Sequence, residues 1–205
     1  MNKHLVMACV AACAAAGSFA AHAASSDQNW VVHVGAHTVD PVSDSGRLAG
    51  MNSKVGSSTR PTFSAEYFFT PSLSLEVLAA LPFKHDVRLD GARAVSVREL
   101  PPVVGVNYHF LPGSSVSPFL GAGVNYTHFY DAKGTGPLTG AHVELKDSWG
   151  LAAHGGVDVH INDRWMVTAD LRWIQIRSKV SVGGERVGKA RIDPLAYGLS
   201  VGYRF

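Results

Sequence analysis

The stretch Leu195-Ala196-Tyr197-Gly198-Leu199-Ser200-Val201-Gly202-Tyr203-Arg204-Phe205 decides the fold. Every second residue from Leu195 to Phe205 is apolar or aromatic, and the residues between them are small or polar. Successive side chains of a β-strand point to opposite faces of the sheet. A period of two therefore predicts a strand with one apolar face.

The same alternation recurs seven times upstream of this segment. The predicted strands cover residues 30–39, 63–69, 73–81, 104–110, 120–127, 149–161, 165–173 and 195–205. The connections alternate in length: 70–72, 111–116 and 162–164 are short, whereas 40–61, 84–96, 128–146 and 178–189 are long. Short turns at one end and long loops at the other are typical of transmembrane barrels.

Charge is sorted between the two faces of these strands. The face assigned to lipid carries no charged residue, and a Lys or Arg there would cost about 2–4 kcal/mol at the bilayer centre. The opposite face carries nearly all strand charges, namely Glu66, Glu76, Asp158, Asp170, Arg172 and Arg204. In hydrocarbon every backbone group must be paired, so strands cross only as a closed barrel. We predict an all-β, eight-stranded antiparallel up-and-down transmembrane barrel with short periplasmic turns and long extracellular loops.

Aromatic residues at the strand ends support this prediction. They would form two girdles at the membrane interfaces, made of Trp30, Trp149, Trp165, Trp173, Tyr203 and Phe205. A soluble barrel such as a lipocalin-like carrier inverts the pattern, with apolar residues inside. Period alone does not distinguish the two, but the aromatic last strand and the loop asymmetry favour the membrane.

The first 23 residues have the features of a cleaved signal peptide. Lys3 precedes an apolar run, and Ala21-His22-Ala23 is a small-x-small cleavage site. We expect a leader over 1–23 and one barrel domain over 24–205. Both cysteines, Cys9 and Cys13, lie in the leader, so the mature chain has no thiol. A lipidated Cys13 is the alternative, but the basic and apolar stretches before it are very short.

The remaining charges nearly balance. Removing Lys3 from the 18 basic residues leaves 17 against 16 acidic ones. A nucleic-acid-binding protein normally shows a basic excess or stripe. None is visible in the sequence, so we expect no nucleic-acid partner.

The motifs resemble the OmpW family of outer-membrane proteins along most of the mature chain. They run in the order 78–85 (LAALPFKH), 100–102 (LPP), 118–127 (PFLGAGVNYT), 146–150 (KDSWG), 156–158 (GVD), 193–194 (DP) and 202–205 (GYRF). The resemblance implies a narrow, largely apolar lumen and passage of small hydrophobic molecules, with responses to stress and, in some members, bacteriocin reception.

The family's lumen is constricted by a Leu and a Trp. The Leu matches Leu78, whose position in the alternation also turns it inward, together with Phe68. The Trp position is occupied here by Arg172. This departure implies a more polar constriction than the family has.

The inward charges have two interpretations. Glu66, Glu76, Asp158, Asp170, Arg172 and Arg204 either line a conduction path or neutralise one another and plug the lumen. The interior of eight strands is only just wide enough for side chains, so we favour the plug for most of them. Leu78 and Arg172 are the residues we expect to matter for function.

Neither metal nor catalytic chemistry is indicated. The mature chain has eight histidines: His33, His37, His85, His109, His128, His142, His154 and His160. Those sharing a strand face are four or six residues apart, roughly 13 and 20 Å, too far to share a metal by themselves. Pairing across strands is left open, but we expect no metal, cofactor or enzyme activity, because no signature marks a nucleophile.

We therefore expect a narrow channel in the bacterial outer membrane that releases apolar solutes through its wall into the bilayer. The alternative is a barrel that only presents the loops 40–61 and 128–146, for adhesion, bacteriocin or phage reception, or envelope integrity. The expected partners are the lipid bilayer and its lipopolysaccharide, the barrel-assembly machinery through the last strand, and small apolar solutes. We expect a monomer.

Overall fold

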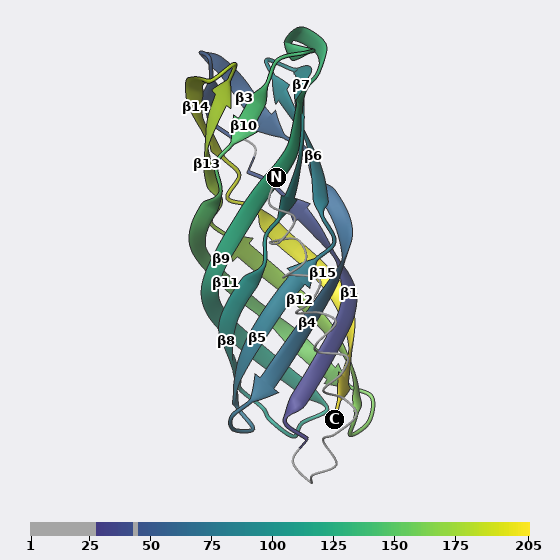
Figure 1. Ribbon diagram of the computed structural model, residues 1–205. Helices are drawn as coiled ribbons and strands as arrows, with labels where there is room; N and C mark the ends of the chain where they lie inside the picture. The colour runs from purple at the N-terminus through teal and green to yellow at the C-terminus, as the bar shows by residue number, and fades with distance from the viewer. Residues whose placement is uncertain (1–27, 43–44) are drawn as a thin grey trace.

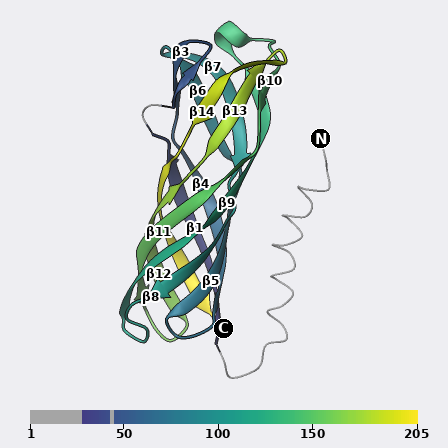
Figure 2. The same ribbon diagram turned by 90° about the vertical axis from the view of Figure 1, so that its left-hand side faces the viewer.

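Strands form nearly the whole chain in the computed structural model, which describes residues 28–42 and 45–205. Eight of them close into an antiparallel barrel (Figure 1 and Figure 2): β1 (Trp30–Asp40), β4 (Ser58–Phe68), β5 (Leu73–Ala80), β8 (Val103–His109), β9 (Val116–Gly134), β11 (Ser148–His160), β12 (Trp165–Ile174) and β15 (Leu195–Arg204). Each pairs with the next along the chain, and β15 returns to β1, where Val201 lies opposite Val34. The predicted fold is confirmed, while the expected leader, residues 1–23, lies outside the described residues.

The two ends of the described chain meet at one end of the barrel. Trp30 N–H donates to the Phe205 carbonyl at 3.3 Å, and Phe205 N–H donates to the Trp30 carbonyl at 3.0 Å. The short turns lie at the same end, and polar side chains hold them. Asn162 Oδ1, for example, accepts the backbone N–H of Trp165 at 2.9 Å. This end corresponds to the periplasmic side of the prediction.

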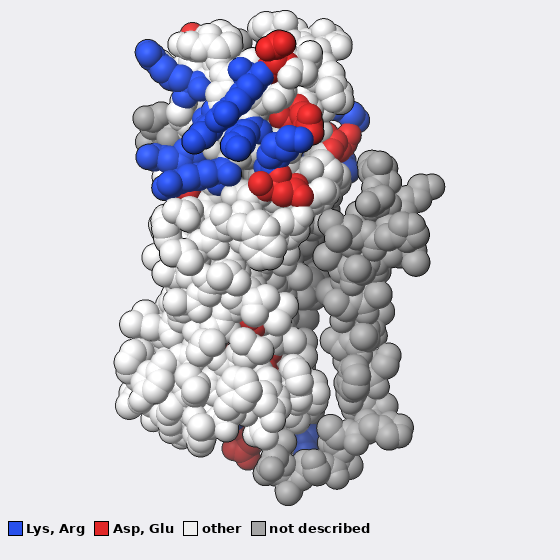
Figure 3. Space-filling model, turned by 60° about the vertical axis from the view of Figure 1, so that its left-hand side comes forward, with Lys and Arg blue, Asp and Glu red and all other residues white. Residues whose placement is uncertain are grey.

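The wall of the barrel is apolar outside and polar inside. Leu120, Leu151 and Leu199 are 60 to 64 % exposed on the outer surface. In the space-filling view the wall is a band almost free of charged side chains, below a charged upper third (Figure 3). The outward face is apolar because a membrane surrounds it, and the charged remainder is enclosed.

The long connections are built mainly of strands. They extend the barrel upward through β2 (Arg47–Leu48), β3 (Met51–Val55), β6 (Phe83–Leu89), β7 (Ala92–Leu100), β10 (Val143–Leu145), β13 (Arg177–Val182) and β14 (Glu185–Arg191), with a short 3-10 helix at Gly136–Leu138. Two-residue turns join several of these strands. Asp90 and Gly91 (φ 45° and 87°) and Gly183 and Gly184 (φ 60° and 88°) adopt the positive φ values of tight hairpins.

Polarity is inverted between this extension and the wall below it. Phe83, Val87 and Leu89 of β6 point inward and are buried, whereas Lys84 and Arg88 point outward and are exposed. Water, rather than lipid, surrounds the extension, so its apolar side chains gather inside. Among the described residues, no helix is long and apolar enough to cross a membrane.

The main apolar core fills the interior of the extension. Its buried members come from strands on all sides and include Val55, Val87, Leu89, Val97, Phe129, Val143, Ile174, Ile176, Val180 and Ile192. A second, small apolar cluster of Val31, Phe68 and Met166 closes the lower end of the lumen. The polar part of the lumen lies between these two apolar regions.

Aromatic residues mark both edges of the apolar band. At the lower edge Trp30 packs on Tyr67, with ring centroids 5.0 Å apart, and Trp165 packs on Tyr203 at 4.9 Å. Phe205 stacks on Tyr203 at 6.3 Å. Toward the extension, Trp149 packs on Tyr126 at 4.8 Å, and Trp173 lies opposite Leu195 on the outer wall. The six aromatic residues assigned to the membrane interfaces therefore lie near the strand ends.

Candidate functional site

An arginine cluster crosses the middle of the lumen. Arg172 of β12 donates Nη1–H and Nη2–H to the two carboxylate oxygens of Glu76, both at 2.9 Å. Its Nε–H donates to Asp170 Oδ2 at 2.6 Å. Glu76 lies on β5, which is four strands from β12 in either direction around the barrel. The guanidinium therefore spans the lumen from wall to wall.

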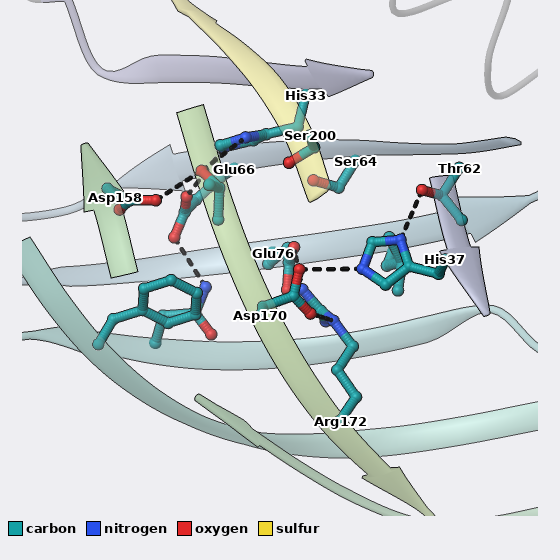
Figure 4. Close-up of a pocket in the computed structure, with 14 residues that line it drawn as sticks. His33, His37, Thr62, Ser64, Glu66, Glu76, Asp158, Asp170, Arg172 and Ser200 are labelled. Carbon is teal, nitrogen blue, oxygen red and sulfur yellow. Dashed lines mark hydrogen bonds and ion pairs between the residues drawn. The ribbon is translucent and has the colours of Figure 1, made fainter. Parts of the chain in front are cut away.

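His37 completes this cluster from a third side of the barrel. Its Nε2 lies 2.9 Å from Asp170 Oδ1, and its Nδ1 lies 2.7 Å from Thr62 Oγ1. Figure 4 shows His37, Asp170 and Arg172 meeting in the lumen, with Glu76 beside them. We call Arg172, Glu76, Asp170 and His37 the arginine cluster.

A second group, the histidine cluster, consists of His109, Glu66, Asp158 and His33. The imidazole of His109 lies between two carboxylates, with Nε2 3.1 Å from Glu66 Oε1 and Nδ1 3.3 Å from Asp158 Oδ2. His33 Nε2 lies 3.7 Å from Glu66 Oε2. Glu66 also accepts hydrogen bonds from Ser74 and, at 2.8 Å, from Asn107.

Two residues link the two clusters. His154 Nε2 lies 2.6 Å from Asn107 Oδ1 and 3.5 Å from Glu76 Oε2. Asn107 in turn donates to Glu66. The polar side chains thus form one network through the lumen.

The network contains four carboxylates, one guanidinium and four imidazoles. All of these groups are buried, and a buried charge is tolerated only when it is paired. Each of the four carboxylates accordingly lies within 4 Å of the guanidinium or of an imidazole. The lumen is closed at this level. The cavity among the lining side chains measures about 20 Å³, which is room for about one water molecule.

The eight residues predicted to line the lumen all lie inside the barrel, at different heights. Leu78 is at the boundary, because it lines the small cavity and also packs against the apolar core above it. The charged residues Glu66, Glu76, Asp158, Asp170 and Arg172 belong to the network. Phe68 lies at the bottom, and the Arg204 guanidinium carbon is 4.9 Å from the centre of its ring.

Sequence reasoning missed the four histidines of the network. The alternation placed His33, His37, His109 and His154 on the inward face. Spacing along single strands did not bring them together, and pairing across strands was left open. The register across the barrel brings them together with the acids. Among the described residues, no group of three or more His, Cys, Asp or Glu is arranged to hold a metal ion.

A further buried pair lies in the extension. His85 of β6 and Glu99 of β7 are 1 % and 0 % exposed, with Nε2 3.2 Å from Oε1. Burial lowers the pKa of His85, but the close contact with the Glu99 carboxylate and its charge outweigh this effect, so the pKa lies above its ordinary value. His85 and Glu99 therefore form a buried ion pair between β6 and β7 on the inner surface of the extension.

The closed barrel, its apolar wall and its enclosed charges define a transmembrane β-barrel of the outer-membrane type. The chain belongs to the OmpW family, whose model matches residues 16–205. It is 34 % identical over 212 residues to the outer membrane protein W of Vibrio cholerae, covering 96 % of this chain and 98 % of that protein. The chain is therefore a protein of the bacterial outer membrane.

One solved structure superposes on the barrel, and a further relative matches it in sequence. The crystal structure of the outer membrane protein OprG from Pseudomonas aeruginosa superposes with a TM-score of 0.75 at 29 % identity, covering 86 % of this chain and 95 % of that one. The dibenzothiophene metabolism operon protein PahQ of Pseudomonas aeruginosa is 25 % identical over 166 residues, which are 78 % of this chain and 77 % of that protein.

Proposed function

We propose that the chain is a narrow, non-enzymatic passage that takes small apolar solutes from the exterior into the outer membrane. The observation that carries this proposal is the change of lining along the lumen. The interior of the extension is apolar, whereas the lumen below it is closed by the polar network, with about 20 Å³ of free space. The side chains above the network are apolar and would favour an apolar solute once they moved aside, whereas the network below leaves no open route.

The exit for such a solute is through the wall beside Leu78. Pairing between β5 and β8 ends at Leu78, which lies opposite Val103. Pairing between β6 and β7 begins at Phe83, which lies opposite Glu99. Within this described part of the wall, no ladder pairing joins residues 79–82 to residues 100–102. The wall is therefore weakest at the floor of the apolar interior.

Pro101 explains the interruption. The Pro102 carbonyl accepts the Tyr126 N–H of β9 at 3.1 Å. Backbone groups of successive residues in a strand point to opposite sides, so Pro101 faces the end of β5. A proline has no N–H to continue the ladder there.

The chemistry of one relative agrees with an apolar solute. PahQ is named for an operon of dibenzothiophene metabolism, and dibenzothiophene is an apolar aromatic compound. Its resemblance to this chain supports the same solute class here. The sequence-based expectations of bacteriocin or phage reception, and of recognition of the last strand by the barrel-assembly machinery, stay predictions.

Uptake of dibenzothiophene by cells that lack their own relative of the chain tests the proposal. Cells producing the chain should take up the probe faster than cells without it. Leu78→Asp places a carboxylate at the floor of the apolar interior and should abolish the gain, while the apolar control Leu78→Met should retain it. Equal uptake by the Asp and Met variants would contradict the proposal.

A second pair of variants tests the exit. Pro101→Ala supplies an N–H toward β5 and should slow uptake by favouring a continuous ladder. Pro102→Ala is the matched control, because its N–H points toward β9, where the strands are already paired. If both substitutions leave uptake unchanged while Leu78→Asp abolishes it, the solute passes the floor but leaves by another route.

A further inference from the structure

Basic residues form a collar around the extension. Of the 17 Lys and Arg that follow Lys3, Arg172 lies in the lumen and Arg164 and Arg204 lie at the lower end, which leaves 14 in or beside the extension. The near-neutral total of the chain hides this excess, because four carboxylates are enclosed in the lumen. Figure 3 shows the Lys and Arg side chains gathered directly above the uncharged band.

Part of this positive charge is concentrated on the outer face of β13 and β14. Arg177 lies opposite Arg191, and Lys179 lies opposite Lys189, with all four side chains exposed. Like charges directly opposite on neighbouring strands are destabilising. We call these four residues the basic face.

One carboxylate partly neutralises the basic face. Asp193 Oδ2 lies 3.2 Å from Arg177 Nη2 and 3.7 Å from Arg191 Nε. Lys179 and Lys189 have no ion pair in the part of the chain that the structure describes. The basic face therefore retains a net positive charge and two free ammonium groups.

Other basic residues of the collar have acidic partners. Arg93 Nη2 lies 2.7 Å from Asp86 Oδ1, and Lys133 Nζ lies 2.9 Å from Asp131 Oδ1. Further like-charged neighbours lie on β3, β6 and β7, where Lys54 and Arg93 lie opposite Arg88 and Lys84 lies opposite Arg98. The basic face differs from these pairs in the apolar surface that lies below it.

A groove runs along the lipid-facing wall below the basic face. This shallow, open depression measures about 410 Å³ and is lined by Gly155, Ala169, Leu171, Tyr197, Gly198 and Leu199. It also borders Asp170, whose carboxylate lies in the lumen. These residues lie on β11, β12 and β15, and β12 leads into β13 just as β14 leads into β15. Small residues on three strands lower the surface between larger apolar side chains, which makes an open slot in the apolar band.

We infer that this side of the barrel binds a phosphorylated glycolipid of the outer leaflet, with its phosphates on the basic face and an acyl chain in the groove. Arg and Lys form strong charge-assisted hydrogen bonds with phosphate oxygens. A phosphate between the opposed cations removes the repulsion that the folded chain leaves in place. The inference depends on the location of the chain in the outer membrane and not on the proposed passage of solutes.

Binding of bisphosphorylated lipid A to the purified full chain in detergent micelles, followed by native mass spectrometry, tests this inference. Lys179→Ala combined with Lys189→Ala should weaken binding about thirtyfold, since each basic residue near an anionic lipid surface contributes about a fivefold change in affinity. The matched control is Arg93→Ala combined with Lys133→Ala. It makes the same change in charge on the same collar, but at residues that already have acidic partners, and should weaken binding less than threefold.

Two further arms identify the source of the affinity. Lipid A stripped of its phosphates should bind weakly to the unaltered chain, and Ala169→Leu, which fills the groove, should weaken binding of the intact lipid. Millimolar inorganic phosphate alone should fail to displace the lipid. Equal losses in the two double variants, or equal affinity for lipid A with and without phosphates, would overturn the inference. Heat-dependent mobility in gel electrophoresis would show that each variant has folded.

Discussion

Replacing Arg172 by Met should destabilise the barrel more than any other single change in the lumen. The guanidinium makes three hydrogen bonds of 2.6 to 2.9 Å with Glu76 and Asp170 and is only 4 % exposed. Asp170 keeps His37 at 2.9 Å when Arg172 is removed. Among the residues that the structure describes, Glu76 keeps only His154, at 3.5 Å.

The magnitude follows from this imbalance. Removing one partner of a buried ion pair costs about 3–5 kcal/mol, because the other charge is left buried without compensation. Replacing the whole pair with apolar residues of similar volume is often close to neutral. Arg172→Met should therefore lower the free energy of unfolding by about 3–5 kcal/mol, whereas Arg172→Met combined with Glu76→Met should recover all but about 1 kcal/mol.

Urea unfolding in phospholipid micelles, followed by tryptophan fluorescence, provides the measurement. The two single variants and the double variant form a double-mutant cycle, which isolates the coupling between the residues. The isosteric Glu76→Gln is a useful control, since it keeps hydrogen-bonding capacity without charge. A loss below about 1 kcal/mol for Arg172→Met, or strictly additive effects in the cycle, would refute the assignment of Arg172 and Glu76 as a coupled buried pair.

Three further predictions concern the wall, the extension and a turn. Leu199→Arg on the lipid-facing wall should lower the free energy of unfolding in micelles by about 2–4 kcal/mol. The control Ser96→Arg, in the extension, should lower it by almost nothing. Equal losses would argue against lipid around the wall and water around the extension. Because the pKa of His85 is raised above 6.5 in the folded chain, its ionic stabilisation is complete below that pH and is lost as pH rises through the raised value. Glu99→Gln should therefore destabilise the chain more at pH 6 than at pH 9, and a pH-independent loss would contradict this coupling. Gly184→Ala, at φ 88°, should cost about 1–2 kcal/mol by straining the β13–β14 turn, and unchanged urea unfolding would count against the turn geometry.

The alternation of apolar and polar residues was sufficient to predict the barrel. Each strand predicted from it overlaps a wall strand, because lipid on one side and an enclosed lumen on the other impose the same period of two on all eight. The long connections were harder to interpret. In β6 the apolar residues point inward and Lys84 and Arg88 outward, the reverse of the wall, since water surrounds the extension. Turn-forming residue pairs in the long connections, such as Asp90-Gly91, were the sequence signal that these connections form hairpins.

The sequence by itself determined which side chains enter the lumen and which face the membrane. Local alternation sorts the side chains onto two faces, and the aromatic last strand and the loop asymmetry identify the face that meets lipid. Only the tertiary structure decided which inward side chains meet. Arg172 and Glu76 are separated by 96 residues and become partners because the strand order and register place β12 across the lumen from β5. The same closure concentrates the acids inside and the bases on the collar, a separation of charge that no count along the chain reveals. The physical reason is that the strand period is local, whereas contact across a barrel depends on how all eight strands close.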